Sequence, residues 1–405
     1  MVNHAEVIWT RNFSSLLLSN AFFFGGFHML LPTIPLLATQ MGGTKTQVGL
    51  IAGIFVLSSV IIRLFTDFEV RILGKRNCLL IGIAISLVSV VTYLLAPSVE
   101  ALLWIRVLHG IGFGIGTTFY IAIVSDFIPA TRRGEGLGHF GLATTIAMAV
   151  APATGLWVAD AYGFSAMFLV ATIAELIALL SLAGCSFPSR APVASHPRLS
   201  RSFGDHTTIM DIFVERGTKL PAFLMVLFGI GYGSVLNFIA VYASELHLAN
   251  PGYFFILGTS CIFLSRLGVG KIYDRKGAAW VILPGAVLFL GGLVMVAETT
   301  STTMFLAASV LYGLGVGMLY PALQAEIINM VPPERRSGAS ATFSNALDVG
   351  LGGGSVLLGL FAERAGLSAA YFAAAAVMIV FLAVYSCHLS LQKGAPGGLP
   401  VVEEK

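Results

Sequence analysis

An arginine and a histidine stand three residues apart within an otherwise apolar stretch, RVLHGIGFGIGTTFYIAIVSD, residues 106–126. A permanent charge at the centre of a membrane helix costs roughly 2.5–3.5 kcal/mol, so Arg106 needs a polar cavity or a partner. His109, one turn further on, can change its charge near neutral pH. The pair indicates a functional site within the membrane. The alternative is a structural arginine bound to backbone carbonyls beside a packing histidine.

Two further titratable residues interrupt long apolar runs. His28 lies deep in the first run, beside two helix-shaping prolines, and Asp348 lies midway along the eleventh. Each can take up a proton, and we therefore count both with Arg106 and His109 as candidates for proton coupling. A substrate contact is the alternative for His28, and a hydrogen bond between helices is the alternative for Asp348.

Composition defines the class of protein that holds these residues. Of the 405 residues, 57% are apolar and 11% are charged. Soluble domains carry about 25% charged residues, so a soluble protein is excluded. The apolar runs have roughly 18 to 27 residues, which is long enough for helices that cross about 30 Å of hydrocarbon, and alternating strands of barrel type are absent. We predict an all-α polytopic membrane protein.

Proline, glycine and charged clusters divide the chain into twelve spans. The predicted spans are residues 13–38, 46–66, 77–96, 101–127, 136–157, 165–184, 219–243, 252–267, 278–297, 302–328, 339–361 and 368–389. A polar segment rich in Pro, Ser and Arg separates the sixth from the seventh and is typical of a linker. The predicted organisation is a six-helix bundle over residues 1–187, a cytoplasmic linker over 188–217, a second bundle over 218–390 and a cytoplasmic tail over 391–405.

Lys and Arg residues indicate the orientation in the membrane. If the N-terminus is inside, then of the 23 Lys and Arg residues only Lys45 and Arg364 fall outside, and Arg106 lies within the membrane. Cytoplasmic loops carry the excess of Lys and Arg in membrane proteins. We therefore predict a multi-pass protein of the cytoplasmic membrane with both termini in the cytoplasm.

The two halves of the chain repeat each other at an offset of 203 residues. Four landmarks coincide: RLFTDFEVRILG (63–74) with RLGVGKIYDRKG (266–277), VLHGIGFG (107–114) with VLYGLGVG (310–317), PATRR (129–133) with PPERR (332–336), and DAYGFSAMF (160–168) with ERAGLSAAY (363–371). Parallel repeats of this kind are a transporter architecture, with the substrate site between the halves near the membrane midplane. We expect two pseudo-symmetric six-helix bundles.

The segment GKIYDRKG (270–277) resembles the loop motif G-x-x-x-D-R-x-G of the major facilitator superfamily, and the likeness covers essentially the whole chain. The resemblance implies that a cytoplasmic gate is latched by Gly270, Asp274, Arg275 and Gly277. The first-half copy has Asp67 where the motif has Gly and Arg71 where it has Asp. Its latch is therefore expected to be rewired, and a helical contact between these two residues is one arrangement open to it.

Two more segments carry the resemblance. Arg106-x-x-His109-Gly110 is similar to the fourth-helix motif R-x-x-Q-G, whose arginine is associated with proton transfer in the family. The fifth helix follows the antiporter motif G-x8-G-x3-G-P-x2-G with two glycines replaced by alanine, at Gly138, Ala147, Ala151, Pro152 and Gly155. The resemblance thus extends to the twelve-helix drug:proton antiporters and adds Pro152 to the gating residues. Residues 106–136 and DVGLGGG (348–354) also suit the members that export opine-type metallophores.

The major facilitator fold places the first, fourth, seventh and tenth helices around a central cavity. On a period of 3.6 residues, Thr117 shares a face with Arg106, and Asn20 shares one with His28. The candidate substrate-binding residues are Asn20, Phe24, Phe27, Thr117, Tyr232, Asn237, Tyr320 and Gln324. Hydrogen bonding between helices is an equal alternative for Tyr232 and Asn237. Glu175, in the sixth span, is expected by the same analogy to face lipid.

The sequence therefore predicts proton-coupled export, or antiport, of a small amphipathic organic molecule by alternating access. A proton symporter for uptake of a small solute and an exporter of an opine-type metallophore are the alternatives, and a membrane sensor that transports nothing is a remote one. No nucleophile–base set, metal spacing or phosphate loop is present, so we expect no enzyme activity, cofactor or metal. The expected partners are substrate, protons and lipid, without nucleic acid, and the expected state is a monomer.

Overall fold

Helices make up the fold throughout the part of the chain that the computed structural model describes, residues 7–129, 132–185, 187, 214–215, 217–248, 250–332 and 335–394. The first half contains α1 (Arg11–Gln40), α2 (Lys45–Arg63), α3 (Thr66–Tyr93), α4 (Val99–Phe127) and α5 (Arg133–Ser181). The second half contains α7 (Lys219–Glu245), α8 (Gly252–Lys276), α9 (Ala279–Ala297), α10 (Thr302–Asn329) and α11 (Arg336–Gly394). Most of the predicted linker, 188–217, and residues 395–405 of the predicted tail lie outside the described residues.

Two of the ten helices in the described residues are long enough to cross a membrane twice. α5 has 49 residues and α11 has 59, and a straight helix of such length would extend over about 70 Å or more. Gly163 (φ 84°) and Gly366 (φ 87°) interrupt these helices with left-handed backbone, which glycine adopts without a Cβ clash. Each long helix therefore supplies two spans. The described helices thus give the twelve predicted spans and confirm an all-α polytopic membrane protein.

The internal repeat reappears in the backbone. Gly74 (φ 76°) breaks α3 between a short first segment and its membrane span, and Gly277 (φ 89°) ends α8. These two glycines are 203 residues apart, as are Gly163 and Gly366. The halves therefore turn with the same backbone conformation at the same positions.

Serine caps follow the same offset. Ser98 accepts a hydrogen bond from the backbone N–H of Ala101 at the start of α4, and Ser301 accepts one from Met304 at the start of α10, both at 3.3 Å. A side-chain oxygen at this position satisfies one of the N–H groups that lack a partner within the helix. The two helices that carry Arg106 and Tyr320 therefore begin at equivalent points.

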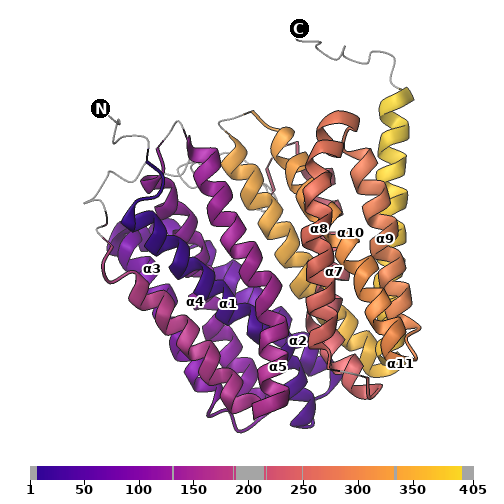
Figure 1. Cartoon of the computed structure of the whole chain (residues 1–405), viewed down its shortest axis with the longest axis horizontal. Coiled ribbons are helices and arrows are strands. Elements are labelled where there is room, and N and C mark those ends of the chain that lie inside the picture. Colours follow the sequence, from indigo (N-terminus) through magenta and orange to yellow (C-terminus); the bar gives the residue numbers. More distant parts are fainter. Residues whose placement is uncertain are drawn as a thin grey trace, which may run out of the picture.

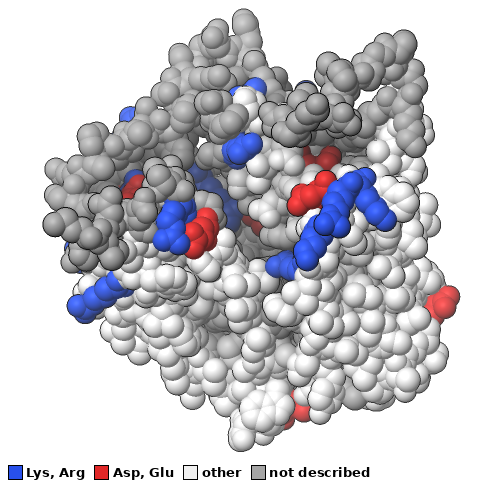
Figure 2. All heavy atoms as spheres, turned by 45° about the horizontal axis from the view of Figure 1, so that its top comes forward, with Lys and Arg blue, Asp and Glu red and all other residues white. Residues whose placement is uncertain are grey.

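The helices of the two halves form two groups that lie side by side (Figure 1). α1 begins and α11 ends at one end of the molecule, which we call the terminal face; the opposite end is the far face. Figure 2 shows Lys and Arg, with some Asp and Glu, on the terminal face around a hollow between the halves, above a flank almost free of charge. Large exposed apolar side chains such as Leu57, Trp104 and Trp280 lie on the molecule's surface, as expected of a surface that contacts lipid.

Polar contacts and close helix packing join the two halves toward the far face. Lys45 of α2 forms an ion pair with Glu245 of α7 at 3.1 Å, and Asn250 donates to Asp160 at 2.9 Å. Between α2 and α11, Gly49 packs on the backbone of Ser355 and Gly53 on Val356. The absence of a Cβ at these glycines lets the two backbones approach closely.

Candidate functional site

Arg106 is enclosed within the first half of the molecule and forms no ion pair with a carboxylate of the described residues. The residue is 1% exposed, and its Nη2 donates to the backbone carbonyl of Leu30 in α1 at 3.2 Å. Its guanidinium carbon lies 5.3 Å from the ring centre of Phe55 and 5.9 Å from that of Tyr93, within range of cation–π attraction. Nε and Nη1 are buried without a hydrogen-bond partner. The protein therefore leaves two donors of this cation unused.

His109 lies beside Arg106 and shares a neighbour with it. The histidine is fully buried, its Nδ1 is 3.4 Å from the hydroxyl of Tyr93, and its Nε2 has no hydrogen-bond partner. Since Tyr93 also faces the guanidinium of Arg106, the three side chains form one buried polar cluster between α3 and α4. The structure thus brings the predicted pair together inside the first half.

An aromatic wall connects His28 with His109. The Nδ1 of His28 bonds to the carbonyl of Phe24 at 2.8 Å, and the His28 ring stacks on the Phe24 ring at a centroid distance of 5.9 Å. Phe27 approaches His28 at 5.0 Å on one side and His109 at 6.0 Å on the other. Phe27 also packs on Phe113, at 4.1 Å. Predicted substrate residues Phe24 and Phe27 and both predicted histidines therefore belong to one cluster.

The two predicted amides are bonded to neighbouring helices through their nitrogen atoms. Nδ2 of Asn20 donates to Thr144 of α5 at 2.6 Å, and Nδ2 of Asn237 donates to Ser355 of α11 at 3.0 Å. The Oδ1 atom of each amide is buried without a partner. Each side chain therefore ties two helices together and keeps an acceptor that the protein does not use.

The second half contributes tyrosines to the centre of the molecule. Tyr232 is 8% exposed and lies parallel to Tyr312 at 6.4 Å, between α7 and α10. Tyr320 is half-buried, with its ring edge-on to Phe343 of α11 at 5.1 Å. Gln324 is half-buried one turn further along α10. Of the two predicted residues of α10, Tyr320 thus contacts α11.

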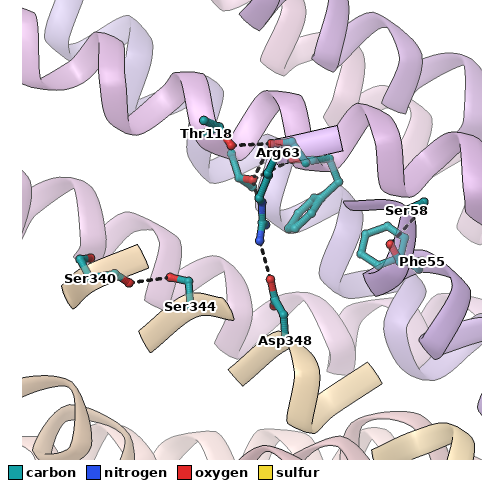
Figure 3. Close-up of polar contacts among 10 residues, drawn as sticks. Phe55, Ser58, Arg63, Thr118, Ser340, Ser344 and Asp348 are labelled. Atoms are coloured by element: carbon teal, nitrogen blue, oxygen red, sulfur yellow. Dashed lines mark hydrogen bonds and ion pairs between the residues drawn. The ribbon is translucent and has the colours of Figure 1, made fainter. Parts of the chain in front are cut away.

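Asp348 forms an ion pair across the two halves. Nη1 of Arg63, the last residue of α2, donates to Oδ2 of Asp348 in α11 at 2.5 Å (Figure 3). Nη2 of the same arginine donates to Thr117 of α4 at 3.3 Å. From the sequence, Arg63 was expected only on the cytoplasmic side, with most of the Lys and Arg residues. The structure shows that it instead connects predicted proton residue Asp348 with predicted substrate residue Thr117.

A second arginine occupies the equivalent place in the other half. Nη1 of Arg266 in α8 donates to the hydroxyl of Thr145 in α5 at 3.2 Å. Its Nε is buried without a partner, and it makes no ion pair with a carboxylate of the described residues. Neither Arg266 nor Thr145 was predicted from the sequence, although the 203-residue offset relates Arg266 to Arg63 and Thr145 to Asp348.

The predicted loop latches lie at the terminal ends of α3 and α8. Asp274 and Arg275 are exposed, and Gly277 caps α8 with left-handed backbone. Gly270 has open space around its Cα, with nothing within 4 Å of the position that a Cβ would take. Arg71 is exposed, and the side chain of Asp67 lies outside the described residues. The pairing of Asp67 with Arg71 and the gating roles of all these residues remain predictions.

Other contacts hold these helix ends in place. Lys75 of α3 forms an ion pair with Asp126 of α4 at 2.6 Å, and Tyr273 of α8 donates to Glu326 of α10 at 3.1 Å.

In α5, Pro152 is buried, and Gly155 packs against the backbone of Met29 in α1. Gly155, one of the glycines kept in the fifth-helix motif, therefore allows close packing of α5 on α1.

Glu175 is buried, which corrects the expectation that it faces lipid. The side chain is 0% exposed in the second span of α5, and its Oε1 accepts a hydrogen bond from Ser86 of α3 at 3.1 Å. Its Oε2 is buried without a partner. Gly26 of α1 packs directly on this carboxyl group. The family placement of the sixth span predicted a side chain that faces lipid. Gly26 has no side chain, and this leaves room for the Glu175 carboxyl group inside the first half.

Comparison with known proteins agrees with this architecture. A model of the Major Facilitator Superfamily matches residues 16–323 and again residues 261–403. The chain is 23% identical over 381 residues to an uncharacterised MFS-type transporter of Methanocaldococcus jannaschii, covering 92% of this chain and 95% of that protein. It is 22% identical over 366 residues to the staphylopine export protein of Staphylococcus aureus, covering 89% and 91%.

Solved structures show the same fold. A bacterial homologue of the human lysosomal transporter Spinster, in an inward-facing and unoccupied conformation, superposes with a TM-score of 0.75 at 15% identity, covering 95% of this chain and 98% of that one. A point mutant of the nucleoside transporter NupG superposes with a TM-score of 0.72 at 12% identity, covering 93% and 99%.

Proposed function

Because the chain belongs to the Major Facilitator Superfamily, we propose that this transporter exports a small amphipathic organic molecule in exchange for protons, by alternating access. The observation that carries this proposal is the one-sided closure of the two halves. Gly49 and Gly53 of α2 pack on the backbone and side chains of α11 toward the far face, whereas the terminal face is hollowed between the halves. A central site in this state is open to one side of the membrane.

The terminal face is the cytoplasmic side in this proposal. Lys and Arg gather on that face, and membrane proteins keep such residues in the cytoplasm. The protein then resides in the cytoplasmic membrane as a monomer with both termini inside. A substrate enters the hollow from the cytoplasm and leaves after the halves rock about the central site.

Asp348 is the coupling residue that the geometry supports best. Its side chain is 26% exposed, and its carboxylate binds Arg63 across the halves. A proton on Asp348 removes the charge that attracts Arg63 and therefore weakens one of the contacts between α2 and α11. Proton binding and opening between the halves are then linked through a single ion pair.

Arg106, His109 and His28 have a supporting role in this mechanism. The three residues lie inside the first half, and none is more than 5% exposed in this conformation. Arg106 fixes a positive charge there, while Phe24 and Phe27 offer an aromatic surface to an amphipathic substrate. Asn20 and Asn237 each provide a free amide oxygen that can accept a hydrogen bond from the substrate.

An opine-type metallophore is the second candidate substrate. One relative, similar over 89% of this chain, is named a staphylopine export protein. Metallophores of the opine class carry carboxylates. Such groups would suit the two arginines that bond across the halves, Arg63 and Arg266. Both candidates are exported in the same direction and differ only in the substrate. One transport assay with several substrate classes therefore tests both.

Everted membrane vesicles with an imposed proton gradient and a lumenal pH dye test the proposal. The substrates to add are lipophilic cations, antibiotics and metal-chelating opines, with Arg106→Ala as the impaired variant. Substrate-triggered proton efflux from the lumen that disappears in Arg106→Ala supports antiport and identifies the substrate class. Export is wrong if no compound moves protons while the purified protein accumulates a solute inward in right-side-out vesicles, since the protein then works as an uptake symporter.

A further inference from the structure

Arg63 and Arg266 each belong to a set of three residues, and the internal repeat makes the two sets equivalent. In one set, Arg63 contacts Thr117 of its own half and Asp348 of the other half. The 203-residue offset converts these positions into Arg266, Tyr320 and Thr145. Arg266 does bond to Thr145 across the halves, at 3.2 Å. The duplicated fold has therefore kept the same arrangement of an arginine and a residue of the opposite half at both places.

One difference separates the sets: the acid is missing from the second. Asp348 offers Arg63 a carboxylate, whereas Thr145 offers Arg266 only a hydroxyl oxygen, whose own hydrogen is donated to the carbonyl of Gly141 at 2.9 Å. Nε of Arg266 is buried and bonds to nothing. A partly buried guanidinium is much more favourable with a carboxylate beside it than without one. The second set is thus short of one negative charge.

The net charge of the two sets together is positive. Arg63 and Arg266 carry two positive charges, and Asp348 provides one negative charge. Tyr320, the third residue of the second set, packs edge-on against Phe343 of α11, the helix that also carries Asp348. Residues of both sets therefore meet the same helix.

We propose that Arg266 binds a carboxylate of the transported molecule, which occupies the place that Asp348 takes beside Arg63. This inference rests on the proposed export function and specifies its substrate class as an acid with an apolar or aromatic body. The planar guanidinium can donate from Nε and one Nη to both oxygens of a carboxylate. Arg266 is half-buried and bonds to Thr145 of the other half, so it lies where the two halves meet.

Purified protein in lipid nanodiscs tests this assignment by thermal unfolding. The probes are N-carboxyethylphenylalanine, an opine-type acid with two carboxylates, and its diamide, which has nearly the same shape but no carboxylate charge. Binding to the folded state raises the apparent unfolding temperature. We expect the acid to stabilise the wild-type protein. The diamide should need at least about a tenfold higher concentration for the same rise in unfolding temperature, because it cannot form a charge-assisted pair with the arginine.

Three substitutions locate the effect. Thr145→Asp gives Arg266 an internal acid like the one beside Arg63, and should abolish stabilisation by the probe. Thr145→Asn introduces a side chain of nearly the same size as aspartate but without its charge. This variant should still be stabilised by the acid, with a smaller shift in unfolding temperature than the wild-type protein. Arg266→Gln, which removes the cation, should abolish the shift even if Thr145→Asp folds poorly. Equal shifts from acid and diamide, or an acid-dependent shift that survives in Arg266→Gln, would overturn the proposal.

The same variants in the vesicle assay separate this proposal from the export function. Proton-coupled transport of cations or neutral compounds, without stabilisation by the acid, would leave export intact and reject the carboxylate site. Stabilisation by the acid that depends on Arg266, without proton movement for any compound, would retain the site and reject proton-coupled export.

Discussion

Arg63 of α2 and Asp348 of α11 join the two halves of the transporter through an ion pair of 2.5 Å (Figure 3). The two side chains are 21% and 26% exposed, so water screens the pair less than it would on an open surface. The pair also lies closer to the terminal face than the glycine contacts of Gly49 and Gly53. It is therefore placed to release a proton into the hollow.

Asp348→Asn should uncouple transport from protons. The amide keeps the size of the carboxylic acid but can neither release a proton nor hold Arg63 by charge. We expect uptake into everted vesicles driven by a proton gradient to fall at least about tenfold, a loss equivalent to roughly 1.4 kcal/mol of coupling. Exchange of labelled for unlabelled substrate, which needs no net proton movement, should continue.

Asp348→Glu is the matched control, since it keeps a titratable acid one methylene longer. It should retain part of the gradient-driven transport. If Asp348→Asn remains fully driven by the gradient, the coupling proton binds elsewhere, and the buried Glu175 becomes the first acid to examine.

Closure of the far face should depend on Gly53. A Cβ at this position would lie well inside the van der Waals radius of Val356 Cγ2, and valine in a helix strongly prefers one rotamer. Gly53→Ala should therefore hold the halves apart at a cost of about 1–3 kcal/mol. Accessibility of a cysteine at Lys45 to a membrane-impermeant thiol reagent measures the resulting exposure.

Relief of this clash gives a specific control. Val356→Ala removes Cγ2 and leaves Cβ at 3.7 Å from the added methyl group, which is ordinary contact. The double variant Gly53→Ala/Val356→Ala should therefore regain low labelling. Gly353→Ala, on the same helix as Val356 with nothing within 4 Å, should not change labelling. Labelling that stays high in the double variant would show that another effect of Gly53→Ala keeps the halves apart.

The helical fold could be predicted from the sequence because each of its signals is local. Apolar runs gave the spans, and the two long helices needed only the turning glycines Gly163 and Gly366 to divide them. The repeat was equally visible, since both copies keep the residues at which the backbone must turn. Helix packing at Gly110 and Gly114 of α4, against Ser58 and Ser59 of α2, also follows the small-residue pattern.

The site could be predicted only in part, because partners from distant helices are not written into a local pattern. Arg106, His109 and Asp348 were visible as polar residues in apolar runs. Arg63 and Arg266 were not, because a charge at a helix end has the same sequence signal whether it meets water or another helix. Applying the offset to pairs of residues, rather than to single segments, would have related Arg266 and Thr145 to Arg63 and Asp348.

Glu175 should contribute to stability through its hydrogen bond with Ser86. Glu175→Leu leaves the buried hydroxyl of Ser86 without this acceptor, an arrangement that costs about 1–3 kcal/mol. Glu175→Gln keeps the volume and one oxygen acceptor, so it should cost less than about 1 kcal/mol. Thermal unfolding in nanodiscs compares the two variants, and Ser86→Ala combined with Glu175→Leu should recover part of the loss. Equal losses for Gln and Leu would mean that the charge itself stabilises the fold.

His109→Gln should preserve proton-coupled transport, although His109 can titrate in principle. The glutamine at this position matches the R-x-x-Q-G pattern that the fourth helix resembles, and its amide can still reach the hydroxyl of Tyr93. We expect at least about half of the wild-type transport and an unchanged pH profile, because the residue is fully buried within the first half and makes no contact with Asp348. Arg106→Lys serves as the contrast: a lysine cannot lie flat against Phe55 and Tyr93 while it donates to Leu30, so transport should fall by about tenfold or more. If His109→Gln instead flattens the pH profile of transport while exchange continues, the histidine carries the coupling proton, and Asp348 has the structural role of holding Arg63.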